Sequence, residues 1–307
     1  MSTVFLAIMP IFILLLLGYM ALKTEFINAS TWIQVEKATY FVLFPCLLIH
    51  QLANAQIDWS SAGYLMTFAL LIPVIGSALA FLVQFFLKHE GASFTSDYQG
   101  SIRFNTYIGL ALILALLPKE ATPLAAIVIA IMIPWINILC ILVFARYAKG
   151  VPNTKAILKQ MARNPLILGS VIGLVINLMT LPLPSIVNEV LKRLGDMTLP
   201  LGLLTVGAGL KWRSLHAYTR SLVSTSLIKL LLLPLIILGL GLMLNLDNLT
   251  LSVVVILAAL PTASSAYILA RQLGGNADLM AAIITLQTLA ALITLPLMLW
   301  WLASATR

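Results

Sequence analysis

Long stretches of almost uninterrupted apolar residues recur along this chain, as in residues 11–17 and 230–233. Hydrophobic residues make up 61% of the chain and charged residues only 9%, whereas a soluble domain carries about 25% charged residues. A chain this apolar cannot cover its own core with a polar surface, so we expect lipid to cover it. Backbone groups in lipid must bond internally, which requires helices or a closed barrel. Barrel strands alternate apolar and polar residues, so the continuous runs predict an all-α integral membrane protein.

A helix that crosses a membrane needs about 20 mostly apolar residues. The N-terminal stretch lacks the basic region that opens a signal peptide, so we expect it to be the first membrane helix. The sixth stretch is short, because two prolines follow it at 182 and 184. The predicted segments are 3–22, 35–53, 62–87, 99–117, 122–148, 166–180, 188–210, 218–244, 250–272 and 277–302.

Basic residues collect on one side of these predicted segments. The side that holds the N-terminus carries Lys119, Lys192, Arg193 and Arg307, while most other basic residues, including those of the central linker, fall on the opposite side. Loops rich in Lys and Arg stay in the cytoplasm. We therefore expect a cytoplasmic linker, both termini outside, and the inner (plasma) membrane of a bacterium. The net charge of +8 reflects this topology signal, and we expect the bilayer rather than nucleic acid as its partner.

An internal repeat emerges when the chain is shifted by 155 residues. Pro10 then falls on Pro165, Gly18 on Gly173, Lys37 on Lys192 and Pro45 on Pro200. The starts of two predicted segments, 62 and 122, fall at 217 and 277. An odd number of spans in each half inverts the second half, and inverted repeats are typical of secondary transporters. We expect a first five-helix repeat at 1–148, a linker at 149–164 and a second repeat at 165–307.

The fourth and ninth segments are polar at repeat-related positions. The ninth contains Pro261, which removes a backbone hydrogen bond and breaks the helix, followed by Thr262, Ser264 and Ser265. The fourth contains the polar stretch 103–107, including Asn105 and Thr106. Broken helices expose free N–H groups and the positive ends of helix dipoles. This pattern predicts a binding site for a small organic anion such as a dicarboxylate, although a kinked helix with self-bonded hydroxyls is the alternative.

The stretch 103–109 (Arg-Phe-Asn-Thr-Tyr-Ile-Gly), together with residues 257–271, Asn164-Pro165 and the stretch 273–278, resembles the auxin efflux carrier family over essentially the whole chain. Its bacterial members, often described as malonate or malate permeases, look most similar. The plant members have proline at both crossovers, whereas Phe104 stands at the first one here.

This resemblance implies a fold like that of the bile acid–sodium symporters. Helices 1, 2, 6 and 7 would form a scaffold domain, through which a homodimer is expected. The other helices would form a transport domain that moves like an elevator. Helices 4 and 9 would cross as broken helices, with Asn105 and the Pro261 region lining the substrate site.

Several other polar residues lie inside predicted spans. Lys229 interrupts the eighth span, and an intramembrane lysine marks a functional site by default. It could balance an anion's charge, help gating, or snorkel to the interface. Arg103 could snorkel or line the cytoplasmic mouth. Asn137, Gln287 and Thr288 could contact the substrate or bond neighbouring helices.

The carboxylates of the sequence all fall in predicted loops or near segment ends. Glu36 and Lys37 open the second segment and are assigned either a coupling or gating role or that of an interfacial pair. Proton-coupled carriers often place an acid deep in the bundle, so proton coupling through a central Asp or Glu is disfavoured. Sodium bound by carbonyls and hydroxyls, and uncoupled transport, stay open. No cofactor or metal is expected.

Three other functions compete with a carrier. An intramembrane metalloprotease needs a His-Glu-x-x-His motif, but the pair His89-Glu90 has no second histidine after it. A prenyl-transfer enzyme needs clustered aspartates, which the sequence lacks, so we do not expect an enzyme. An anion channel and a non-transporting sensor on a transporter fold remain as alternatives.

Overall fold

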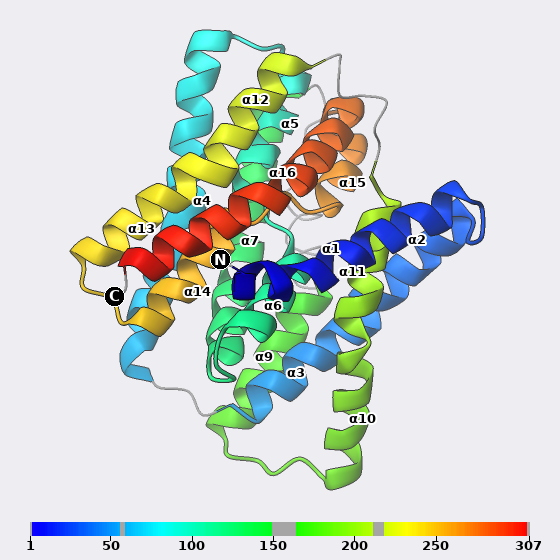
Figure 1. Cartoon of the computed structure of the whole chain (residues 1–307), viewed down its shortest axis with the longest axis vertical. Helices are drawn as coiled ribbons and strands as arrows, with labels where there is room; N and C mark the ends of the chain where they lie inside the picture. Colours follow the sequence, from blue (N-terminus) through cyan, green and yellow to red (C-terminus); the bar gives the residue numbers. More distant parts are fainter. Residues whose placement is uncertain (1, 56–58, 149–163, 211–217, 306–307) are drawn as a thin grey trace.

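The computed structural model describes residues 2–55, 59–148, 164–210 and 218–305. Within these residues every regular element is a helix (Figure 1). The elements are α1 (Ser2–Lys23), α2 (Ala29–Ala38), η1 (Thr39–Leu43), α3 (Phe44–Ala53), α4 (Trp59–Leu87), α5 (Gly91–Ile102), α6 (Thr106–Leu116), α7 (Ala121–Tyr147), α9 (Pro165–Leu178), α10 (Ser185–Asp196), α11 (Thr198–Ala208), α12 (Thr219–Leu227), η3 (Ile228–Leu232), α13 (Leu233–Met243), α14 (Asn248–Ala259), α15 (Ser265–Gln272) and α16 (Ala277–Ala305).

The helices confirm a multi-pass membrane protein of the all-α class. Each of the ten predicted segments contains helix, and five helical stretches of the described residues are long and apolar enough to cross a membrane: Ala29–Ala53, Gly63–Leu87, Ala121–Tyr147, Thr219–Met243 and Ala277–Ala305. The number of spans and the inversion of the second half stay predictions. The predicted linker lies, except for residue 164, outside the described residues.

Two predicted segments begin too late. The second starts at Ala29 rather than residue 35, and the fourth starts at Gly91 rather than residue 99. The polar residues at the start of α5 are buried between helices instead of facing lipid; they include Thr95, Ser96 and Gln99. Hydropathy alone cannot separate such a helix from a loop, because it does not report which neighbours cover the polar face.

The expectation that no carboxylate lies inside the helical bundle is wrong. Asp97 stands in the second turn of α5 and is 7% exposed. The prediction failed because the start of α5 was read as a loop. Glu36, in the last turns of α2, is half-buried and faces a cavity.

Two helices are interrupted where they cross. Extended backbone at Arg103 separates α5 from α6, and extended backbone at Leu260 separates α14 from α15. The N–H of Asn105 donates a 2.8 Å hydrogen bond to the carbonyl oxygen of Pro261, so each break satisfies a backbone group of the other. The two stretches therefore lie in contact, as expected, and this backbone hydrogen bond joins them.

The helices pack in two groups. One group contains α1, α2, α3, α9, α10 and α11, which contact one another. The other contains α4, α5, α7 and α12 to α16, and α6 contacts members of both. Figure 1 shows α4, α12 and α13 on one side of the molecule and α2, α3, α10 and α11 on the other.

Close backbone approach holds the first group together. A Cβ at Gly18 of α1 would overlap the carbonyl oxygen of Leu204 in α11, and a Cβ at Gly207 of α11 would overlap that of Leu15. Similarly, a Cβ at Gly173 of α9 would lie 3.1 Å from the Cα of Ile49 in α3. Small residues permit such contacts between membrane helices. The two glycines that the repeat pairs, Gly18 and Gly173, therefore make the same kind of contact.

Two helices contain a π-helical turn. In η1 the N–H of Phe44 bonds to Thr39, and in η3 the N–H of Leu233 bonds to Ile228, five residues back in both cases. A proline follows each turn, at Pro45 and Pro234. Because proline cannot donate a backbone hydrogen bond, the extra residue of a π turn lets the helix continue past it. Such turns are frequent at functional sites.

Candidate substrate site at the helix crossover

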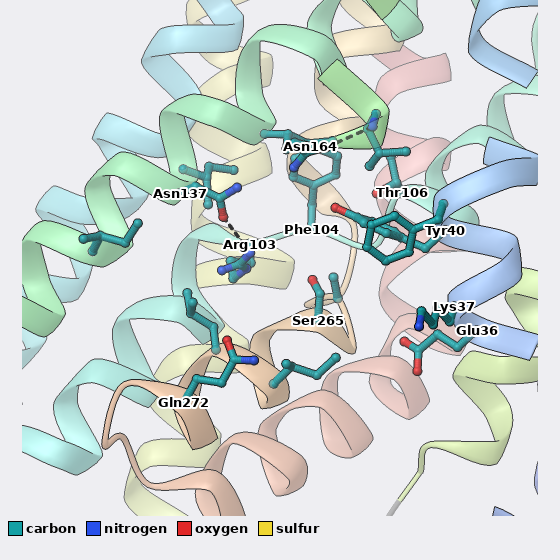
Figure 2. Close-up of a pocket in the computed structure, with 18 of the residues that line it drawn as sticks. Glu36, Lys37, Tyr40, Arg103, Phe104, Thr106, Asn137, Asn164, Ser265 and Gln272 are labelled. Atoms are coloured by element: carbon teal, nitrogen blue, oxygen red, sulfur yellow. Dashed lines mark hydrogen bonds between the residues drawn. The ribbon is translucent and has the colours of Figure 1, made fainter. Parts of the chain in front are cut away.

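A cavity of about 440 Å³ lies between the two groups of helices (Figure 2). Its walls come from α2, η1 and α9 on one side and from the α5–α6 break, α7 and α15 on the other. Cavities of about 300–1,000 Å³ hold small molecules. The apolar walls are lined by Ile33, Phe41, Phe104, Ile133, Ile136, Ile141, Leu166, Ile268 and Leu269.

A second, smaller cavity of about 40 Å³ reaches the crossover itself. It shares Glu36, Tyr40, Thr106 and Ser265 with the larger cavity and adds residues of the breaks, among them Asn105 and Ser264. The two cavities therefore adjoin, and the smaller one lies at the point where the two broken helices meet.

The first turns of α6 and α15 both face this space. Thr106 opens α6 and Ser265 opens α15, and both residues line both cavities. The N-terminal end of a helix dipole corresponds to about half a positive charge. Two such ends beside one cavity favour a negatively charged occupant.

Asn105 caps α6 at the crossover. Its Oδ1 accepts hydrogen bonds from the N–H groups of Tyr107 (3.1 Å) and Ile108 (3.2 Å), which is the usual role of an asparagine before a helix. Its Nδ2 is buried without a hydrogen-bond partner among the described residues. Since an unsatisfied buried donor costs about 1–3 kcal/mol, this amide is a donor that an anion in the adjoining space could use.

Arg103 places a positive charge in the wall of the larger cavity. Its guanidinium donates to Oδ1 of Asn137 (2.9 Å) and to Oε1 of Gln99 (3.2 Å), both neutral groups. No salt bridge among the described residues includes Arg103. The charge is held in place by amides and is not neutralised by a carboxylate.

Glu36 and Lys37 bring both signs of charge from α2. Oε1 of Glu36 accepts a 3.2 Å hydrogen bond from Oγ of Ser264 in the second break. Lys37 is exposed and also lines the larger cavity. Figure 2 shows these two side chains opposite Ser265 and Arg103. The two residues are not an ion pair, so the interfacial pair that the sequence offers as an alternative does not form.

Thr262 and Gln287 form a buried network behind the second break. Oε1 of Gln287 accepts a bond from the N–H of Thr262 (3.0 Å) and lies 2.7 Å from its hydroxyl, while Nε2 donates to the carbonyl of Gly100 (2.9 Å). Neither residue lines either of the two cavities described above. Thr262 and Gln287 therefore hold α5, α16 and the second break together. The carbonyl of Pro261 instead joins the second break to the first, through Asn105.

Lys229 lies away from both cavities. Its ammonium group donates a 2.7 Å hydrogen bond to the carbonyl of Ala258 in the last turn of α14, and the residue is fully buried. A cation at a helix C-terminus complements the negative end of the dipole. From this position Lys229 stabilises the end of the broken helix α14 and does not contact a molecule in the cavity.

The cavity also contains polar residues that sequence reasoning did not select for the site. These are Tyr40, Asn164 and Gln272. Asn164 caps α9, accepting a 2.9 Å bond from the N–H of Leu166. The Asn-Pro pair at 164–165 is a helix-start signal, but nothing in the sequence shows that this helix end faces the crossover. Among the described residues no three His, Cys, Asp or Glu side chains gather in a way that could hold a metal ion.

Comparison with known proteins adds an independent observation. A family model described as membrane transport protein matches residues 3–299. An uncharacterized transporter of Methanothermobacter thermautotrophicus is 30% identical over 141 residues, which is 46% of this chain. The match also spans only 46% of that protein.

Proposed function

Because the chain belongs to the membrane transport protein family, which is that of the auxin efflux carriers, we propose that it is a secondary carrier for a small organic anion. The single observation that supports an anionic substrate is the cavity at the crossover. Its walls contain two helix N-termini and Arg103, which forms no salt bridge among the described residues. In the low dielectric of a membrane protein these groups attract a carboxylate strongly.

The residues of the cavity divide the work of binding. In this proposal Arg103 supplies the counter-charge, with Asn137 holding its guanidinium in place. Asn105, Thr106, Ser264 and Ser265 supply neutral donors next to the N-termini of α6 and α15. Dicarboxylates and other carboxylates both fit these donors, and the isoleucine-rich walls accept an apolar body.

Transport in this proposal is a movement of one helix group against the other. The cavity lies between them, so sliding of the group that contains α5, α7 and α15 would carry the anion past α2 and α9, as in an elevator. The bond between Glu36 and Ser264 joins the two groups in this state and must break during the movement, which gives Glu36 a gating role. We further propose a homodimer formed through the group that contains α1 and α11, in a bacterial inner membrane with both termini outside.

Uptake by purified protein in liposomes tests the proposal. A panel of labelled mono- and dicarboxylates is offered with and without gradients of sodium, protons and potential, against protein-free liposomes. Saturable uptake with counterflow of one acid supports a carrier. Uptake that does not saturate indicates an anion channel, and binding without uptake indicates a sensor.

A labelling experiment tests the movement. Ser265→Cys is placed in a background that replaces Cys46 and Cys140 by alanine, and sealed vesicles are treated with a membrane-impermeant maleimide. Alternating access predicts that residue 265 reacts from both sides, and that substrate slows both reactions. Reaction from one side alone would contradict the proposed movement.

A further inference from the structure

A histidine, an aspartate and a serine meet outside the cavity, where α4, α5 and α12 come together. Nδ1 of His89, in the turn between α4 and α5, lies 2.7 Å from Oδ2 of Asp97. Oγ of Ser221 in α12 donates to the same Oδ2 at 3.1 Å and lies 3.3 Å from His89 Nδ1. The backbone of His89 is fixed by Gln84, whose amide bonds both its N–H and its carbonyl.

The arrangement differs from the catalytic triad of a hydrolase. In a triad the histidine bonds the aspartate through one ring nitrogen and the serine through the other. Here Asp97 and Ser221 approach the same nitrogen, so the imidazole cannot pass a proton between them. The hydroxyl is instead a second donor to the carboxylate, which leaves Nε2 of His89 to take up a proton.

The electrostatics of the pair favour one bound proton. Oδ1 of Asp97 is buried without a hydrogen-bond partner among the described residues. With a neutral imidazole the pair carries one negative charge in a poorly solvated place, which is costly. One proton on the pair makes it neutral overall, and because the two groups are coupled that proton belongs to both.

Nothing else in the described part of the chain neutralises Asp97. The helices and turns packed on α5 are α4, α7, α12, α15, α16 and η3. The only ion pair of Asp97 among the described residues is with His89. Arg146 lies over the ring of Tyr147, Lys229 bonds Ala258, and Tyr98 bonds Ser77. The other charged or titratable described side chains on or directly beside these elements are Tyr64, Lys88, Glu90, Arg103, Glu120, Cys140, Tyr218, Arg220, Tyr267, Arg271 and Asp278.

The pair is connected to the crossover by α5 itself. Asp97 lies six residues before Arg103 on the same chain, or about 9 Å along a helix at 1.5 Å per residue. Figure 1 shows the α4–α5 turn at one end of the molecule and the crossover near its middle. The side chain of His89 keeps 18% exposure and that of Asp97 keeps 10%, so neither side chain is fully enclosed.

We propose that His89 and Asp97 form a proton-binding site that couples proton movement to the carrier function proposed above. A proton adds to the lone pair of Nε2, giving an imidazolium whose Nδ1–H stays bonded to Asp97. No other bond changes and no electron is transferred. The neutral, proton-loaded pair moves with α5 through the membrane at lower cost than the negatively charged pair, so movement of the helix group carries the proton with it.

The first experiment measures proton binding without any substrate. The three histidines of the chain are labelled with ¹⁵N in purified protein, and their imidazole signals are followed against pH, with His89→Gln to assign His89. Proton binding at this site should weaken at least tenfold in Asp97→Asn, because the carboxylate that shares the proton is lost. The His50 signal should not differ between the two proteins. A His89 signal that does not titrate, or that ignores Asp97→Asn, overturns the site.

The second experiment measures coupling. Liposomes containing a pH-sensitive dye report proton entry during uptake of the acid that the carboxylate panel identifies, relative to protein-free liposomes. A proton gradient should drive accumulation by the wild type and by His50→Gln, but not by His89→Gln or Asp97→Asn. Persistence of the gradient response in both variants overturns the coupling. If no acid is transported, the carrier function fails while the titration still decides the proton site.

Discussion

The N–H of Asn105 donates a hydrogen bond of 2.8 Å to the carbonyl oxygen of Pro261, joining a break in the first half of the chain to a break in the second. Neither end of this contact depends on a side-chain donor. The side chain of Asn105 is therefore available for other contacts: its Oδ1 caps α6, and its Nδ2 group has no hydrogen-bond partner among the described residues.

Replacement of Asn105 by alanine should abolish uptake in liposomes while the protein still inserts into the membrane. The variant loses an N-cap, worth about 1 kcal/mol, and the unpaired Nδ2 donor of a residue that lines the smaller cavity. Asp247→Ala is the matched control, because Asp247 caps α14 through Leu249 and Thr250 at the end of that helix opposite to the crossover. Equal uptake by the two variants would mean that Asn105 acts only as a helix cap and does not bind the substrate.

Arg103→Gln should raise the KM for an anionic substrate about tenfold or more, with a smaller change in the maximal rate. The reason is that the cavity loses a positive charge that no carboxylate neutralises. Concentration-dependent initial uptake measures both quantities. Arg146→Gln, at the end of α7, removes an equal charge outside the cavity, and an equal effect there would point to the overall charge of the protein instead.

Glu36→Gln should lower the KM for an anion several-fold. Glutamine keeps an oxygen that can accept the bond from Ser264 but removes a negative charge that repels the substrate. Lys37→Gln has the opposite sign and a smaller size, since Lys37 is exposed and solvent screens it. A rise of KM in Glu36→Gln would argue against an anionic substrate in this cavity.

Lys229→Met should lower the maximal rate and leave KM within about twofold. Its ammonium group supports the end of α14 through Ala258 and does not reach the cavity. The same uptake measurement separates the two parameters, with the exposed Lys192→Met as control. A large increase in KM with an unchanged rate would instead mean that Lys229 contacts the anion.

Gly207→Ala should destabilise the protein by about 1–3 kcal/mol, as overpacking does, because its Cβ overlaps the backbone of Leu15. Gly239→Ala is the control: no atom lies within 4 Å of a Cβ there, and alanine is the better helix former. Thermal unfolding in detergent compares the two. Similar midpoints would show that α1 and α11 can separate without cost.

The sequence predicts the helices well because the free energy of burying apolar groups in lipid depends on composition over about 20 residues. The repeat also singles out the stretches of Asn105 and Pro261 as related, and the resemblance implies that they cross, as the backbone bond between the two residues shows. The sequence misses Asp97, because the polar first half of α5 does not resemble a membrane span. It also misses Tyr40, Asn164 and Gln272, which line the cavity only because of tertiary packing. For Lys229 the sequence shows that a lysine within a span has a specific role, but it does not show that the side chain bonds the carbonyl of Ala258.

The π turn η1 has a consequence for how this protein could be altered without any visible change in its hydropathy. The π turn of Thr39–Leu43 holds one residue more than an α-helical turn, so deletion of one residue there would convert it into an α-helical turn. The span would remain long enough for the bilayer and nearly as apolar. Pro45 would then follow a regular α-helical turn, whose hydrogen bonds a proline interrupts, so a single-codon deletion could distort the helix beside Glu36 and Lys37 while every charged residue remained in the sequence.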